Sequence, residues 1–111
     1  MPLLNKLKPL HWTSHARAKM GYYRLSPARV RRVLNSPKRI EEGIAPNTVA
    51  TMQPASMKTS ASWSQEIWVM FQDSPKERKV ISAWRYPGVT KPRSELTAAF
   101  LKKEYKEFLA S

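Results

Sequence analysis

The sequence predicts a single α+β domain with two short N-terminal helices, a four-stranded antiparallel sheet and a C-terminal helix. Apolar residues first recur with a helical period, then alternate as they do in strands, and return to a helical period near the C-terminus. The chain has 111 residues, of which 41% are hydrophobic, and this is enough for one core. Separate runs of helices and strands are typical of the α+β class. The domain is expected to cover residues 14–111.

The first helix is expected over His15–Tyr22, with Ser14 as the N-cap whose side chain accepts a backbone hydrogen bond. Residues 1–13 are expected to form an irregular lead-in, because Pro2 and Pro9 interrupt any helix there.

The second helix carries clearer signals. Ser26 is a favourable N-cap, and Pro27 occupies the first helical position, where its missing N–H costs nothing. The helix is expected to end before Pro37, because a residue that precedes proline avoids the helical region. Its buried stripe is predicted to consist of Val30, Val33 and Leu34.

The middle of the chain predicts four strands: Arg39–Ala45, Thr48–Gln53, Glu66–Gln72 and Lys79–Tyr86. Between the second and third, residues 53–64 are rich in small polar side chains without a hydrophobic period, and we expect a mobile loop. Strong helix formers then fill Ser94–Leu109. The apolar stripe expected on this last helix is Leu96, Phe100, Leu101, Tyr105 and Phe108.

Charge is distributed very unevenly along the chain. The protein contains 20 Lys and Arg against 8 Asp and Glu, a formal net charge of +12. Residues 1–40 have no acidic residue and ten basic ones: Lys6, Lys8, Arg17, Lys19, Arg24, Arg29, Arg31, Arg32, Lys38 and Arg39. A local field of one sign attracts polyanions, of which nucleic acid is the commonest in a cell.

Composition excludes several classes of function. There is no cysteine, which rules out disulfides and thiol chemistry and fits a reducing cytoplasm. No apolar run reaches the roughly 20 residues needed to cross a bilayer, so we expect no membrane partner. With three glycines and no glycine-rich phosphate loop, no nucleotide cofactor is expected.

Two stretches resemble a family of small bacterial domains related to BrnT, a toxin of the RelE superfamily. They are His15–Met20 (His-Ala-Arg-Ala-Lys-Met), followed by Leu25-Ser26 and a helix, and Val80–Arg85 (Val-Ile-Ser-Ala-Trp-Arg). Trp84 departs from the pattern, since BrnT proteins tend to have a basic residue there. The resemblance implies a RelE/BrnT-like fold, ribonuclease activity on RNA, in many members at the ribosome, and neutralisation by an acidic antitoxin.

His15 is the candidate proton-transfer group. A histidine titrates near working pH and can take the proton of a ribose 2′-OH. The alternative is a structural histidine that is hydrogen-bonded to backbone. His11 and His15 are four residues apart, which suits a shared metal on one helix, but Pro9 places His11 outside that helix and no carboxylate lies nearby in sequence, so we expect no metal.

Two arginines are candidate phosphate stabilisers beside His15, namely Arg85 and Arg32. Alternation puts Arg85 on a face with Ile81 and Ala83, where it must face a ligand or pair with Glu66, Glu41 or Glu42. The residues expected to bind the nucleic-acid backbone are Arg17, Lys19, Arg24, Arg29 and Arg31.

Aromatic residues offer candidate stacking surfaces for nucleobases. Trp68, Trp84 and Tyr86 lie on the central strands, where a place in the core is the stronger expectation. Tyr22 and Tyr23 lie beside the second, basic helix and are better placed to stack.

Taken together, these patterns predict a small RNA-binding protein, with a metal-independent endoribonuclease toxin of the RelE/BrnT type as the more specific hypothesis. Two alternatives stay open. One is a non-catalytic nucleic-acid or ribosome-binding module, and the other is a protein whose basic face binds an acidic protein partner.

Overall fold

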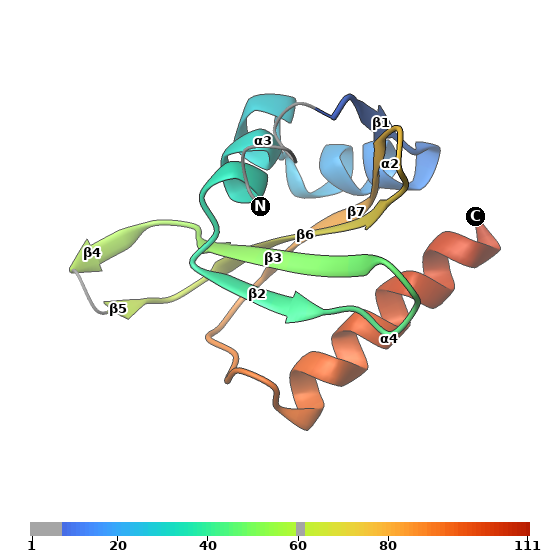
Figure 1. Ribbon diagram of the computed structural model, residues 1–111. Helices are drawn as coiled ribbons and strands as arrows, with labels where there is room; N and C mark the ends of the chain where they lie inside the picture. Colours follow the sequence, from blue (N-terminus) through green and yellow to red (C-terminus); the bar gives the residue numbers. More distant parts are fainter. Residues whose placement is uncertain (1–7, 60–61) are drawn as a thin grey trace.

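The computed structural model describes residues 8–59 and 62–111, and it confirms the α+β class (Figure 1). In order, the elements are β1 (Leu10–Trp12), α2 (Ser14–Tyr23), α3 (Pro27–Asn35), β2 (Arg39–Glu42), β3 (Thr48–Pro54), β4 (Met57–Thr59), β5 (Ser62–Trp63), β6 (Glu66–Asp73), β7 (Arg78–Tyr86) and α4 (Glu95–Ala110). Lys6, part of the predicted basic segment, lies outside the described residues.

The main sheet has five strands in the order β1-β7-β6-β3-β2. Four of these are the predicted strands, and their pairings are antiparallel. The prediction of an all-antiparallel four-stranded sheet is wrong because β1 adds a fifth strand that runs parallel to β7. β1 lies within the predicted irregular lead-in, and its three residues are too few to show a hydrophobic period.

The segment predicted as a mobile loop, residues 53–64, contains regular structure. β3 continues to Pro54, and β4 then pairs antiparallel with β5 in a separate two-stranded sheet. Residues 60–61 of this segment lie outside the described residues. β4 has three residues and β5 has two, and strands this short show no alternation that sequence reasoning can detect.

Helices cover both faces of the sheet (Figure 1). α2 and α3 pack on one face, against Ile67 and Val69 of β6. α4 packs on the other, against Trp68 and Met70. Both faces of β6 are therefore covered, and every residue from Glu66 to Phe71 is buried.

α2 begins one residue earlier than the sequence predicts. Its N-cap is Thr13, which accepts a hydrogen bond from the N–H of Ala16, and Ser14 is the first helical residue. The Thr13 hydroxyl also donates to the carbonyl of Val80 at 2.8 Å. The prediction of Ser14 as the N-cap is therefore wrong. The hydroxyl of Thr13 both caps α2 and contacts β7, and the contact with β7 leaves no signal in the local sequence.

The cap of α3 confirms the prediction, whereas Ser94, which the sequence predicts to be the first residue of the last helix, is its N-cap. Ser26 accepts from the N–H of Arg29 and Pro27 opens α3, while Ser94 accepts from the N–H of Thr97 at the start of α4. The predicted stripe of α4 is wrong at Leu96, which is 49% exposed, because α4 turns Thr97, Leu101 and Glu104 inward. A buried carboxylate thus stands where an apolar pattern predicts only hydrophobic side chains.

Glu66 is fully buried and holds three segments together. One carboxylate oxygen accepts from the indole N–H of Trp68 and the hydroxyl of Thr90, at 3.1 and 2.8 Å. The other accepts from the indole N–H of Trp63 and the backbone N–H of Thr90, both at 3.1 Å. Four donors compensate the buried charge, and they fix the loop before α4 against β6.

No helix in the described parts of the chain is long and apolar enough to cross a membrane.

Replacing Glu66 by glutamine is expected to destabilise the fold. A glutamine side chain has one acceptor oxygen, so its NH₂ group would face two of the four donors. We expect Glu66→Gln to lower the free energy of unfolding by about 2 to 4 kcal/mol. Urea denaturation measures this, with Glu42→Gln on the exposed side of β2 as the matched control. Equal stability of the two variants would contradict this account.

The β6–β7 turn is closed by an ion pair that predicts acid sensitivity. Arg78 donates to both carboxylate oxygens of Asp73, at 2.8 and 2.9 Å, and Lys8 lies 3.7 Å away. Burial acts to raise the pKa of Asp73, but the hydrogen bonds and charges of Arg78 and Lys8 outweigh it, and the pKa falls below its usual 3.8. The stabilisation is therefore present above pH 3.8 and disappears as the pH falls through the lowered pKa.

We accordingly expect Asp73→Asn to be less stable than the wild type at pH 7, with a difference that shrinks once the pH falls below 3.8. Thermal unfolding from pH 7 down to pH 2 tests this. Glu77→Gln is the control, because Glu77 lies in the same turn and forms no ion pair among the residues described. A difference that stays constant with pH would count against the ion pair.

Candidate functional site

Three of the predicted arginines lie together, where α3 meets β3 and β7. We call Arg29, Arg32 and Arg85 the arginine cluster. Arg29 and Arg85 are half-buried and Arg32 is exposed. Within the described residues, none of the three forms an ion pair with a carboxylate. The basic residues that do form ion pairs there are Lys8, Lys19, Arg39, Arg78 and Lys103.

Backbone and amide oxygens hold Arg29 in place. Its guanidinium donates to the side-chain oxygen of Gln53 and to the carbonyls of Pro54 and Ala55, the latter two at 3.1 and 3.3 Å. Gln53 in turn donates to the carbonyls of Arg32 and Ser36, at 3.1 and 2.8 Å. These neutral partners fix the guanidinium without cancelling its charge.

The positive charges of the cluster act on one another. The pKa of Arg29 is lowered from its ordinary value, first by burial and then by the repulsion of Arg32 and Arg85. Arg29 remains protonated, because an arginine pKa lies far above neutral pH. Since no carboxylate of the described residues pairs with the cluster, an anion that binds among the three side chains would relieve this repulsion.

Arg85 does not form the ion pair that the sequence left open. Its Nε donates to the carbonyl of Tyr23 at 2.9 Å, at the end of α2. Glu66 is occupied by its four donors, and Glu41 accepts from Arg39. Arg85 does not share a face with Ile81 either, because the register of β6 and β7 shifts between Met70 and Phe71 and reverses the alternation.

The predicted backbone-binding residues fall into two groups. Arg17, Arg24 and Arg31 are exposed on α2, the turn after it and α3, and the guanidinium of Arg31 lies 5.5 Å from the centre of the Trp12 ring. Lys19 differs, since its ammonium is 3.0 Å from Glu104 and 3.5 Å from Glu107 on α4. Lys19 is therefore neutralised by the fold.

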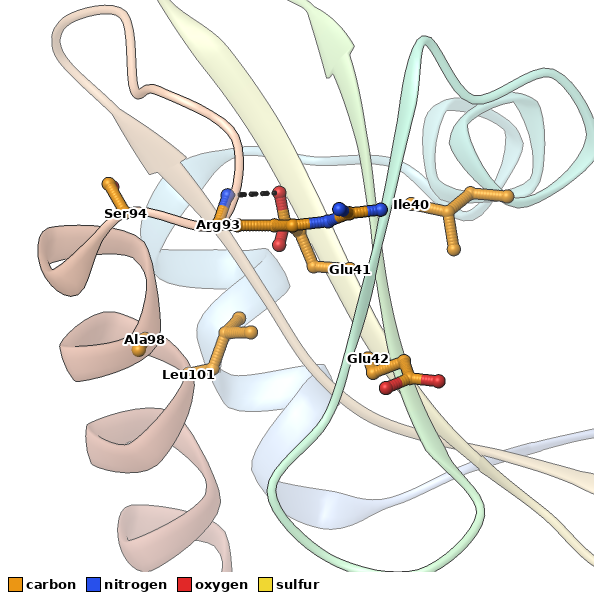
Figure 2. Close-up of a pocket in the computed structure, with 7 residues that line it drawn as sticks. All are labelled: Ile40, Glu41, Glu42, Arg93, Ser94, Ala98 and Leu101. Carbon is orange, nitrogen blue, oxygen red and sulfur yellow. Dashed lines mark hydrogen bonds between the residues drawn. The ribbon is translucent and has the colours of Figure 1, made fainter.

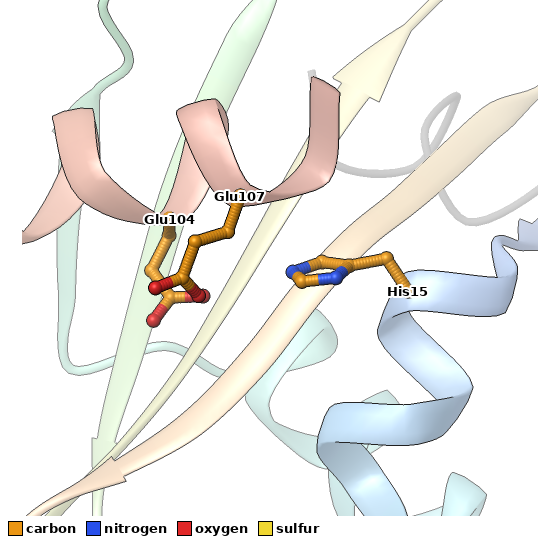
Figure 3. A group of neighbouring side chains, drawn as sticks. All are labelled: His15, Glu104 and Glu107. Atoms are coloured by element: carbon orange, nitrogen blue, oxygen red, sulfur yellow. The ribbon is translucent and has the colours of Figure 1, made fainter. Parts of the chain in front are cut away.

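His15 does not lie in the arginine cluster. It faces α4, and its ring points toward Glu104 and Glu107 (Figure 3). The cluster touches α2 at Tyr23, eight residues and about 12 Å farther along the helix axis. The structure thus brings Arg32 and Arg85 together but leaves His15 apart from them. A catalytic centre of all three remains a prediction.

The aromatic residues separate as expected. Trp68 and Trp84 are buried and stack on each other, with ring centres 6.0 Å apart and planes 5° from parallel. Tyr22 is 79% exposed, and its ring meets that of Tyr23 edge-on at 4.8 Å. An accessible aromatic face therefore lies next to the residue whose carbonyl holds Arg85.

A hollow of about 440 Å³ lies between β2 and the start of α4 (Figure 2). The residues that line it are Ile40, Glu41, Glu42, Arg93, Ser94, Ala98 and Leu101. The carboxylate of Glu41 accepts from the Arg93 backbone N–H and from Nε of Arg39, both at 3.2 Å. The buried carboxylate of this hollow is therefore already hydrogen-bonded within the fold.

Sequence reasoning missed Gln53, Glu104 and Glu107. Gln53 was predicted as the last residue of a strand and the first of a loop, and its contacts with Arg29, Arg32 and Ser36 on and after α3 carry no signal in the sequence. The two glutamates lie one turn apart on α4, where spacing of three residues places them on one side. That spacing was the available signal.

Comparisons with protein-family models, with curated proteins and with solved structures found no match to this chain.

Proposed function

We propose that this protein binds RNA through the arginine cluster. The observation that carries the proposal is a group of three arginines in which Arg32 and Arg85 both repel Arg29, and in which none forms an ion pair with a carboxylate of the described residues. Guanidinium groups are planar donors that match phosphate geometry, and they keep their charge at all physiological pH values. The exposed side chains of Arg17, Arg24 and Arg31 extend the positive surface over α2 and α3.

Exposure of Tyr22 favours a single-stranded segment of RNA as the ligand. Unpaired bases stack on accessible aromatic rings, whereas paired bases cannot. Tyr22 directly precedes Tyr23, whose carbonyl oxygen accepts a hydrogen bond from Arg85. One short segment of RNA could therefore place a base on the Tyr22 ring and a phosphate at Arg85. The resemblance of His15–Met20 and Val80–Arg85 to RelE/BrnT proteins points to the same class of ligand.

Ribonuclease activity is a separate and more demanding proposal. It needs a proton-transfer group near the phosphate, and His15 lies at the far end of α2. Incubation of labelled RNA with the protein in EDTA tests it. Products that end in a 2′,3′-cyclic phosphate would establish metal-independent cleavage, while intact RNA would leave a binding protein.

Binding should depend on the arginine cluster in a way that salt reveals. Arg32 has an exposed side chain, so Arg32→Gln removes one charge at little cost to the fold. We expect its affinity for single-stranded RNA to fall about fivefold at 0.1 M salt, and the slope of log K against log salt to fall by about 0.7. Fluorescence anisotropy with a labelled oligonucleotide measures both quantities.

The charge-matched control is Lys102→Gln, on the exposed side of α4. It should leave the affinity and the slope unchanged. Equal effects of the two variants would mean that only the net charge matters. No binding at low salt would reject the RNA proposal and leave an acidic protein as the partner class that suits the same cations.

A further inference from the structure

We propose that His15, Glu104 and Glu107 form a binding site for a divalent transition-metal ion such as Zn²⁺, at the junction of α2 and α4. The candidate ligand atoms of the three side chains lie within 4.8 Å of one another. His15 projects from the first turn of α2 toward both carboxylates, which project from α4 (Figure 3). This site is independent of the arginine cluster and of RNA binding.

The imidazole provides the observation that points to a ligand. Nε2 of His15 is buried and has no hydrogen-bond partner, and it is the only such side-chain nitrogen or oxygen recorded among the described residues. A buried polar atom without a partner costs free energy. An ion held between the ring and the carboxylates would satisfy this nitrogen.

The donor set selects the kind of ion. One imidazole and two carboxylates suit Zn²⁺ and its neighbours among the transition metals, whereas Mg²⁺ and Ca²⁺ prefer oxygen ligands alone. Zn²⁺ with bonds near 2.1 Å places its ligand atoms about 3.4 Å apart, so the side chains must close in by rotation. Glu104 is already oriented, because the hydroxyl of Ser82 donates to its Oε1 at 2.7 Å.

Lys19 competes with the ion for the same carboxylates. Its ammonium lies 3.0 Å from Glu104 Oε2 and 3.5 Å from Glu107 Oε1, and it balances their charge when no metal is bound. Lysine has a long flexible stem, so the ammonium can move out to solvent. Metal binding therefore has to displace one cation by another. If the three side chains bind a metal, removing the lysine charge should strengthen that binding. If they form only an ion-pair network with Lys19, the same change should create no metal affinity.

Isothermal titration of the 111-residue protein with ZnCl₂ at pH 7.5 tests the proposal. We expect saturable binding of one ion per chain. His15→Ala and Glu107→Gln should weaken it by about tenfold or more, and Lys19→Met should strengthen it. The matched control is His11→Ala, which removes the only other histidine, exposed on β1, and should bind as the wild type does.

Thermal unfolding supplies a second readout, because an ion that joins α2 to α4 should raise the melting temperature of the wild type and not that of Glu107→Gln. Glu107 is only half-buried, so this variant decides the matter if His15→Ala does not fold. No saturable binding by either the wild type or Lys19→Met would overturn the proposal. Loss of binding in His11→Ala with retention in His15→Ala would also overturn it.

Discussion

Thr13 joins the start of α2 to the outer edge of β7. Its hydroxyl caps the helix and donates to the carbonyl of Val80, and its backbone N–H reaches the same carbonyl at 3.3 Å. α2 therefore begins directly after β1, beside β7. Its last residue, Tyr23, packs against the hydrophobic clusters on both faces of the sheet. The placement of α2 brings Tyr23 to Arg85 at one end and His15 to Glu104 at the other.

Acidic groups of the protein are largely committed to positions away from the arginine cluster. Asp73 pairs with Arg78, Glu41 with Arg39, and Glu104 with Lys19, while Glu66 is enclosed by neutral donors. The fold thus neutralises selected cations and leaves α3 and the end of β7 positive. Adjacent like charges do not stabilise a fold, and a surface of this kind attracts polyanions, which is the physical basis of the proposed RNA binding.

Local signals in the sequence predict most of the elements but not how distant ones meet. Ser26 with Pro27 marked α3, and alternation marked β6 and β7, because capping and period are short-range effects. β1 escaped prediction because three residues show no period and pair with a strand 68 positions away. The irregular register near Met70 reversed the expected face of Ile81. Glu104 was missed because an apolar stripe cannot reveal a buried carboxylate that is paired with Lys19.

The most direct test of the central claim follows the arginine Nε–H signals of ¹⁵N-labelled protein by NMR during titration with a short single-stranded RNA. We expect the signals of Arg29, Arg32 and Arg85 to shift first, because these guanidinium groups have no carboxylate partner in the part of the chain that the structure describes. The signals of Arg39 and Arg78, which are held by Glu41 and Asp73, should move little. Shifts that are equal at all five arginines, or larger at Arg39 and Arg78, would contradict the assignment of the cluster as the RNA-binding site.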